Sequence, residues 1–109
     1  MNRKEIKKAL NDYLKAKKEL EEIEDKIAND QTLKKLRSNR ETRKEYFKAL
    51  SIKYPNRINI RNKVDNAAIN LIKIMVENTE FKNENPESIY HDKTTFQKLL
   101  KLANDYTKV

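Results

Sequence analysis

The side chains of this sequence that could do chemistry are mainly cations, and they gather in one third of the chain. Residues 31–63 carry eleven Lys and Arg side chains against two acidic ones. By contrast, residues 1–30 carry eight basic and eight acidic side chains, and residues 64–109 carry six and seven. The formal net charge of +8 is therefore a local feature. A local basic field favours a polyanionic partner or a membrane surface.

Two arginines of the basic region occupy positions where leucine would continue a helical stripe. In one interpretation of Arg40 and Arg43, their methylenes cover the core while their guanidinium groups pair with acids of the preceding helix, Glu21 or Glu24. In the other, they face a partner, because a planar guanidinium binds phosphate or carboxylate through parallel hydrogen bonds. Lys17 is expected opposite Arg43, and two cations at one level fit the second interpretation better.

An aromatic residue lies among the cations at the end of this region. Tyr54 follows Lys53 and is close to Arg57. Single-stranded nucleic-acid sites combine aromatic side chains with cations in this way, because bases stack on the rings. The alternative is a packing role, in which Tyr54 closes one end of the helical bundle against Ile6.

No group of residues predicts catalysis or a metal site. His91 is the only histidine and there is no cysteine, so thiolate ligands and pairs of His ligands are absent. Acid pairs such as Glu21 and Glu24 are ordinary helix-surface neighbours, and nothing gathers a nucleophile, a base and an oxyanion donor. Without glycine there is no Gly-rich phosphate-binding loop. We therefore expect no cofactor, no metal ion and no enzyme activity.

The absence of glycine also indicates the fold class. Glycine is the usual residue where a turn needs φ > 0, so its absence disfavours β-hairpins and favours helices with short polar links. Apolar residues recur at helical spacing in every long segment. The sequence predicts one all-α domain over residues 1–109, a four-helix bundle-like arrangement that opens with a long antiparallel helical hairpin. The expected helices cover about 2–28, 31–53, 57–78 and 93–108.

Caps and apolar faces support these helices. Asn29 or Asp30 is expected to cap the second helix and Asp92 the last one, while Pro55 marks the break before the third. Residues 79–92 are expected to form a polar connection with a short helical turn at Asn85-Pro86-Glu87. The segment 57–78 is apolar over much of its circumference, which is typical of a central helix or of a helix that lends one side to a homo-oligomer. No apolar run is long enough to cross a bilayer, and no signal peptide is apparent, so we expect a cytoplasmic protein.

The expected hairpin has a definite register. With its turn near residue 30, residues whose numbers sum to about 60 lie opposite each other. This register pairs Ile27 with Leu33, Tyr13 with Phe47, and Leu10 with Leu50. The core is expected around Leu71, with neighbours Leu10, Leu50, Val64, Phe47, Met75 and Leu99.

The same register predicts the binding site. It gathers the cations of residues 1–18 and 43–63 at the open end of the hairpin, where few acids offset them. The expected contacts to an anionic partner, either phosphates or an acidic protein surface, are Lys7, Arg43, Lys44, Lys48, Lys53, Tyr54, Arg57 and Arg61.

Three hypotheses for function follow. The first is a non-enzymatic regulatory protein that docks through its basic surface onto nucleic acid or a nucleic-acid-bound protein machine. Products of mobile elements, including inhibitors of nucleic-acid-guided nucleases, are a class analogy for it. The second is a cytoplasmic bacteriocin-immunity protein, because the chain resembles those small basic bundles in length and topology, without a shared residue motif. The third is an oligomeric assembly component.

Overall fold

The structure is a computed structural model that describes residues 3–78 and 85–108, and within these ranges it contains helices and no strand. The elements are α1 (Arg3–Ala28), α2 (Gln31–Arg37), the short 3-10 helix η1 (Arg40–Thr42), α3 (Arg43–Lys53), α4 (Arg57–Asn78), α5 (Pro86–His91) and α6 (Lys93–Thr107). The predicted all-α, bundle-like fold class is confirmed, with α1 and α4 as its long helical pair.

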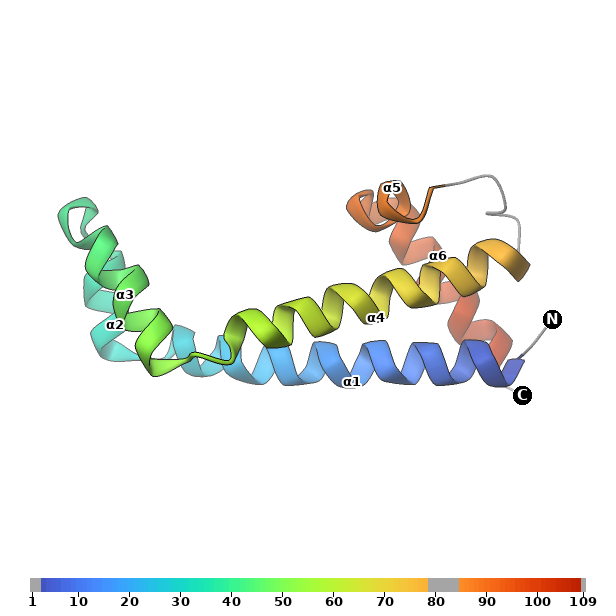
Figure 1. Cartoon of the computed structure of the whole chain (residues 1–109), viewed down its shortest axis with the longest axis horizontal. Coiled ribbons are helices and arrows are strands. Elements are labelled where there is room, and N and C mark those ends of the chain that lie inside the picture. Colours follow the sequence, from blue (N-terminus) through green and yellow to red (C-terminus); the bar gives the residue numbers. More distant parts are fainter. Residues whose placement is uncertain (1–2, 79–84, 109) are drawn as a thin grey trace.

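The molecule is elongated, with principal extents of 52 × 25 × 18 Å. Figure 1 shows α1 and α4 lying antiparallel along its length, with α5 and α6 covering the end near the N-terminus of α1. At the other end α2, η1 and α3 turn away from this axis as a short helical hairpin, which we call the basic hairpin. The fold therefore consists of a packed body and a projection.

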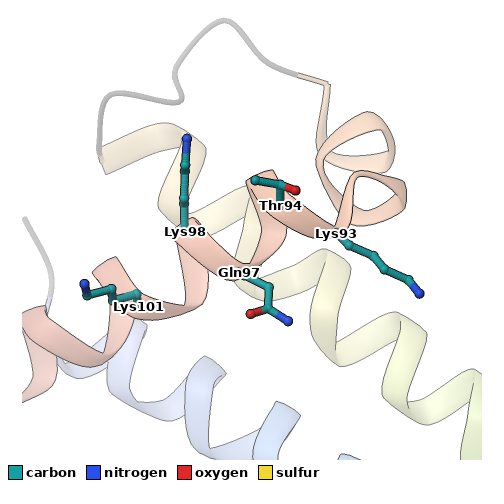
Figure 2. Close-up of a pocket in the computed structure, with 5 residues that line it drawn as sticks. All are labelled: Lys93, Thr94, Gln97, Lys98 and Lys101. Carbon is teal, nitrogen blue, oxygen red and sulfur yellow. The ribbon is translucent and has the colours of Figure 1, made fainter.

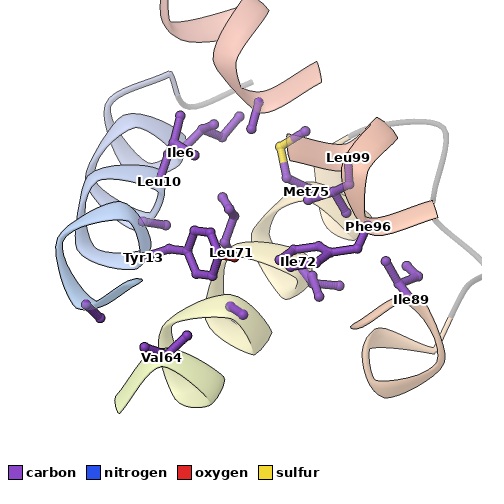
Figure 3. Close-up of a cluster of buried hydrophobic side chains, with 14 residues drawn as sticks. Ile6, Leu10, Tyr13, Val64, Leu71, Ile72, Met75, Ile89, Phe96 and Leu99 are labelled. Carbon is purple, nitrogen blue, oxygen red and sulfur yellow. The ribbon is translucent and has the colours of Figure 1, made fainter. Parts of the chain in front are cut away.

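The main core lies inside the body. Figure 3 shows it as side chains from α1, α4, α5 and α6 that point toward one another. Leu71 is 0% exposed, and Leu10, Val64, Met75 and Leu99 are buried in the same cluster, as predicted. Each large apolar side chain buried in this way contributes about 1.5–3 kcal/mol to folding. This burial holds α1 against α4.

The expected register of the first hairpin is wrong. Helix α1 packs on α4, where Lys63 pairs with Glu19 at 3.6 Å. It also packs on α6, where Tyr13 meets Phe96 edge-to-face at 5.6 Å. Phe47 and Leu50 therefore lie outside the main core, contrary to prediction. The physical reason is competition: α4 offers an unbroken apolar face, whereas the stripe over residues 31–53 contains two arginines that are costly to bury.

A smaller cluster holds the basic hairpin together. Its buried members are Ile27, Leu33 and Leu50, with Ile23, Tyr46, Ala49 and Tyr54 packed against them. Ile27 and Leu33 thus share a cluster, as the expected turn at residue 30 implies. The separation of this cluster from the main one explains why the hairpin forms its own projection.

The predicted helix over residues 31–53 is divided into α2, η1 and α3. Its break falls at Ser38 and Asn39, whose side chains bond to nearby backbone instead of supporting the helix. The Asn39 side chain accepts from the Glu41 N–H at 3.0 Å, and Thr42 Oγ1 donates to the Leu36 carbonyl at 2.6 Å. The chain reverses here, which brings α3 back along α2.

The remaining joints follow the predicted caps. Asp30 accepts from the Leu33 N–H at the start of α2, and Asp92 accepts from Thr94 and Thr95 at the start of α6. Asn85 caps α5, the short helical turn expected there. Residues 79–84 of the predicted polar connection lie outside the described residues.

Candidate functional site

The base of the basic hairpin is closed by one carboxylate. Asp30 Oδ1 accepts from the Leu33 N–H at 3.1 Å, and Oδ2 accepts from the Tyr54 hydroxyl at 3.3 Å. Lys53 also pairs with Oδ2. Asp30 therefore connects the start of α2 to the end of α3, and it is the only buried charged residue among those described.

The electrostatics of this cluster favour both charged forms. The Lys53 ammonium, and then the Leu33 N–H, hold the pKa of Asp30 below its ordinary value. The bond to Asp30 in turn raises the pKa of Lys53. The Asp30 side chain is 5% exposed whereas that of Lys53 is 56% exposed, so the pair has one dry and one solvated member. At neutral pH Asp30 and Lys53 are therefore both charged. We call the cluster of Asp30, Lys53 and Tyr54 the clasp.

Tyr54 has a structural role, as one of the two interpretations expected, but with different partners. It packs in the hairpin cluster and bonds to Asp30, far from the bundle end at Ile6 where one interpretation placed it. Ile6 is instead buried in the main core. Tyr54 also borders a surface hollow at the elbow between α3 and α4, so its ring is half-buried.

The outer side of the basic hairpin carries a group of cations around an aromatic ring. Two neighbouring hollows share the side chains of Arg40, Arg43 and Phe47. One hollow is also lined by Arg37, Ser38, Asn39 and Tyr46, and the other by Lys44 and the acidic residue Glu41. The four cations of the two hollows are exposed. We call these four cations and Phe47 the hairpin surface.

The aromatic ring of the hairpin surface is accessible to solvent. Phe47 is 52% exposed, and it also borders the elbow hollow formed with Leu50, Tyr54 and Ile58. The Arg43 guanidinium carbon lies 5.8 Å from the centroid of the Phe47 ring, a cation–π contact. Tyr46 contacts the same ring edge-to-face at 5.2 Å. The ring is therefore held by two neighbours and still open to a ligand.

The structure shows where the two arginines of the predicted leucine stripe lie. Arg40 and Arg43 are both exposed, and in the described residues neither pairs with Glu21 or Glu24. The core-covering interpretation is therefore wrong for both. Lys17 does not lie opposite Arg43, because α1 packs against α4 instead of α3. The cations of α3 face outward because the inner side of that helix already packs on Ile27 and Leu33.

The predicted site residues are not gathered at one end. Helix α3 carries Arg43, Lys44, Lys48 and Lys53, and Tyr54 follows it. The first turns of α4 carry Arg57 and Arg61, and Arg57 borders the elbow hollow together with Tyr54 and Phe47.

Lys7 is the exception among these residues. It lies on the first part of α1, about 30 Å along that helix from the turn into α2. The predicted basic end that joins Lys7 to α3 does not form, because it depended on the wrong register. The hairpin surface contains two cations that were not among the expected contacts, Arg37 and Arg40, and a ring that was expected in the core, Phe47. The sequence signal that could have indicated this surface is the presence of Arg40 and Arg43 at positions where a leucine stripe would continue.

A second group of cations lies on α6. Figure 2 shows Lys93, Lys98 and Lys101 along one exposed side of this helix, with Thr94 and Gln97 between them. Their side chains fan outward and do not converge on a point. No aromatic side chain lines this shallow hollow. It provides a basic helix face for comparison with the hairpin surface.

Other features of the described residues have structural explanations. Tyr90 on α5 donates to Asp65 on α4, and burial, then this bond, raises the pKa of Tyr90. The Tyr90 ring also packs edge-to-face on Phe96.

Within residues 3–78 and 85–108 no cluster of three His, Cys, Asp or Glu could hold a metal ion. No helix in this part of the chain combines the length and apolarity needed to span a membrane.

Comparison with known proteins gives no family for this chain. No protein-family model, no curated protein and no solved structure matches it.

Proposed function

We propose that this chain is a non-enzymatic binding protein that docks onto nucleic acid, free or within a nucleoprotein complex, through its basic hairpin. The observation that carries the proposal is the hairpin surface, in which four exposed cations surround an exposed ring on a projecting element. Residues 31–53 hold eight basic side chains and two acidic ones. The body of the protein positions this projection.

The charge distribution supports a polyanionic partner. Repulsion among exposed cations disfavours folding, and the ion pairs that would offset it on a surface contribute at most about 1 kcal/mol each. In the hairpin only Lys53 has such a partner among the described residues. Phosphates would neutralise the remaining cations and release condensed counterions, which supplies affinity without reading sequence.

Arginine and an aromatic ring favour nucleic acid over an acidic protein. A guanidinium binds a phosphate through two parallel hydrogen bonds and stacks on planar groups. Three of the four cations of the hairpin surface are arginines, and Phe47 adds a flat face beside them. This combination is the one that nucleic-acid binding proteins use for backbone and base together. The cytoplasmic location expected from the sequence is compatible with such a partner.

The proposal of an assembly component loses its main argument. It depended on an unused apolar side of the helix over residues 57–78, at Ile69, Ile72 and Val76. In the structure Ile72 is 0% exposed, and Ile69 and Val76 pack against the main cluster. On this side of α4 the chain itself therefore covers Ile72 fully and Ile69 and Val76 in part. No observation favours the immunity-protein alternative over binding through the hairpin.

Charge reversal with a matched control tests the proposal. In one variant Arg37, Arg40 and Lys44 are changed to Glu, and in the control Lys93, Lys98 and Lys101 are changed to Glu. Each variant replaces three cations with three acids, so the change in net charge is the same in both. All six side chains are exposed, so we expect little effect on folding. Binding is measured by fluorescence anisotropy with labelled single-stranded and duplex oligonucleotides of mixed sequence.

We expect the hairpin variant to lose at least about tenfold in affinity, which corresponds to 1.4 kcal/mol. The control variant should lose much less. Equal losses would mean that the oligonucleotide senses net charge and not a site, and would overturn the proposal. A wild-type protein that binds none of the oligonucleotides would overturn it as well.

A further inference from the structure

We infer that Phe47, together with Arg43, forms a stacking platform for an unpaired nucleobase, so that the hairpin surface selects single-stranded nucleic acid. This inference rests on the proposed function and narrows its substrate class. It begins from the position of one aromatic ring. Phe47 is a fully apolar side chain, yet it is 52% exposed at the centre of a cationic surface.

Packing does not explain this exposure. The residues of α3 that pack inward are Tyr46, Ala49 and Leu50, which belong to the hairpin cluster. Phe47 lies on the outer side of the helix, where a polar residue would leave that cluster unchanged. Large apolar side chains exposed within a polar rim commonly mark interaction sites. The ring is therefore available for a partner.

The surroundings of the ring match what a base requires. Phe47 borders three surface hollows, so it is reachable from the tip of the hairpin and from the elbow. Arg43 lies 5.8 Å from the ring centroid, and Tyr46 contacts the ring edge-to-face at an interplanar angle of 66°. These contacts restrict the side chain before binding, which reduces the entropy lost when a base stacks on it.

The cations around the ring are placed for the backbone of the same strand. Arg40 and Arg43 line both hollows that share Phe47. Arg37 lines one of these hollows, and Lys44 lines the other together with one acid, Glu41. A strand that stacks one base on the ring therefore brings its neighbouring phosphates toward several guanidinium groups. Stacking platforms flanked by cations are the general device for binding single strands without sequence preference.

A duplex would not use the ring in this way. In duplex DNA the faces of the bases stack on one another, and only their edges are exposed in the grooves. Phe47 has no hydrogen-bonding group with which to read an edge. A duplex would engage the cations alone, so the contribution of the ring distinguishes the two substrates.

An engineered fluorophore gives a direct readout of stacking. The chain contains no tryptophan, so Phe47→Trp introduces a single indole at the centre of the hairpin surface. The probes are a mixed-sequence single strand and the duplex that it forms with its complement. We expect strong quenching by the single strand, because a stacked base quenches indole emission, and little quenching by the duplex at equal occupancy. Equal quenching by both, or none by the single strand, would overturn the inference.

A second variant tests the energetics. Phe47→Leu keeps an apolar helix-forming side chain and removes the flat ring. We expect it to weaken single-strand binding by about 5- to 150-fold, the range for one stacked base, and to leave duplex binding nearly unchanged. The matched control is Ile52→Ala, which removes exposed apolar surface from the same helix outside the three hollows.

The outcomes separate this inference from the proposed function. If the Glu substitutions at Arg37, Arg40 and Lys44 abolish binding while Phe47→Leu has no effect, the hairpin binds nucleic acid without a stacking platform. That result overturns the inference alone. If neither variant changes binding, both the stacking inference and the proposed function are wrong. If Phe47→Leu weakens single-strand and duplex binding equally, the ring supports the surface without stacking on a base, which also contradicts the inference.

Discussion

The Tyr54 hydroxyl donates a hydrogen bond of 3.3 Å to the Asp30 carboxylate, across 24 positions of sequence. Asp30 lies at the start of α2, and Tyr54 follows the last residue of α3. The bond therefore joins the two points at which the basic hairpin leaves the body. Lys53 completes the clasp by pairing with the same carboxylate.

Substitution of Asp30 should loosen the hairpin in two steps. Asp30→Asn keeps a side chain that caps α2 well but loses the charge that pairs with Lys53, and Asp30→Ala loses both. We therefore expect amide hydrogen exchange in α2 and α3 to be slowest in the wild type, faster in Asp30→Asn and fastest in Asp30→Ala. Exchange in α1 and α4 should change little. Asp12→Asn, an exposed change on α1, is the control. Uniform acceleration throughout the chain would show that the clasp stabilises the whole fold and not the hairpin.

The clasp also predicts a pH dependence. Because the pKa of Asp30 is lowered on folding, its contribution is complete above the unfolded value of about 3.9 and is lost as the pH falls through the folded pKa. The raised pKa of Lys53 acts at the other end, where the contribution is lost as the pH rises above about 10.4. The stability difference between wild type and Asp30→Asn, from urea denaturation, should be constant near neutrality and shrink at both extremes. A difference that grows in acid would contradict the assignment.

The two apolar clusters should respond differently to truncation. Leu71 is 0% exposed in the main cluster, so Leu71→Ala should cost about 2–5 kcal/mol of global stability. Leu50→Ala should instead affect the hairpin amides first, because Leu50 packs only in the hairpin cluster. Leu14→Ala, at a side chain 49% exposed, should change stability by less than about 0.5 kcal/mol. A loss below that value for Leu71→Ala, in denaturant titrations, would show that the core is misplaced.

Tyr90 should make the fold sensitive to alkali. Burial raises its pKa, as does its hydrogen bond to Asp65, so its contribution is complete below the unfolded value of about 10 and is lost as the pH rises. Tyr90→Phe should cost about 0.5–1.5 kcal/mol at neutral pH, since one hydrogen bond is lost. The variant should also unfold less steeply with pH above 10. An unchanged alkaline transition would mean that other groups control it.

The fold class followed from the sequence because helical spacing and capping are local properties. Helix α4 agrees with its predicted limits, and Asp30 and Asp92 cap the helices assigned to them. Partner choice between helices is not local. Both residues 31–53 and residues 57–78 have an apolar stripe that could pack on α1. Which of them does so depends on the free-energy cost of burying Arg40 and Arg43, and periodicity alone does not measure that cost.

The site was predicted less completely for the same reason. Arg43 and Lys44 belong to the hairpin surface and were expected contacts, because their charge is visible in the sequence. Phe47 was assigned to the core, since an apolar residue at a helical interval is usually buried. Only the position of α3 outside the body exposes its ring. The separation of Lys7 from α3 likewise follows from the packing of α1 on α4.

The salt dependence of nucleic-acid binding tests the central claim most directly. For a single strand, log K should fall linearly with log[salt], with a slope of about 0.7 for each phosphate neutralised. Removing three phosphate contacts by changing Arg37, Arg40 and Lys44 to Glu should lower that slope by about two to three, whereas the same changes at Lys93, Lys98 and Lys101 should leave it near the wild-type value. An unchanged slope in the hairpin variant, or an equal reduction in both variants, would contradict the assignment of the basic hairpin as the nucleic-acid interface.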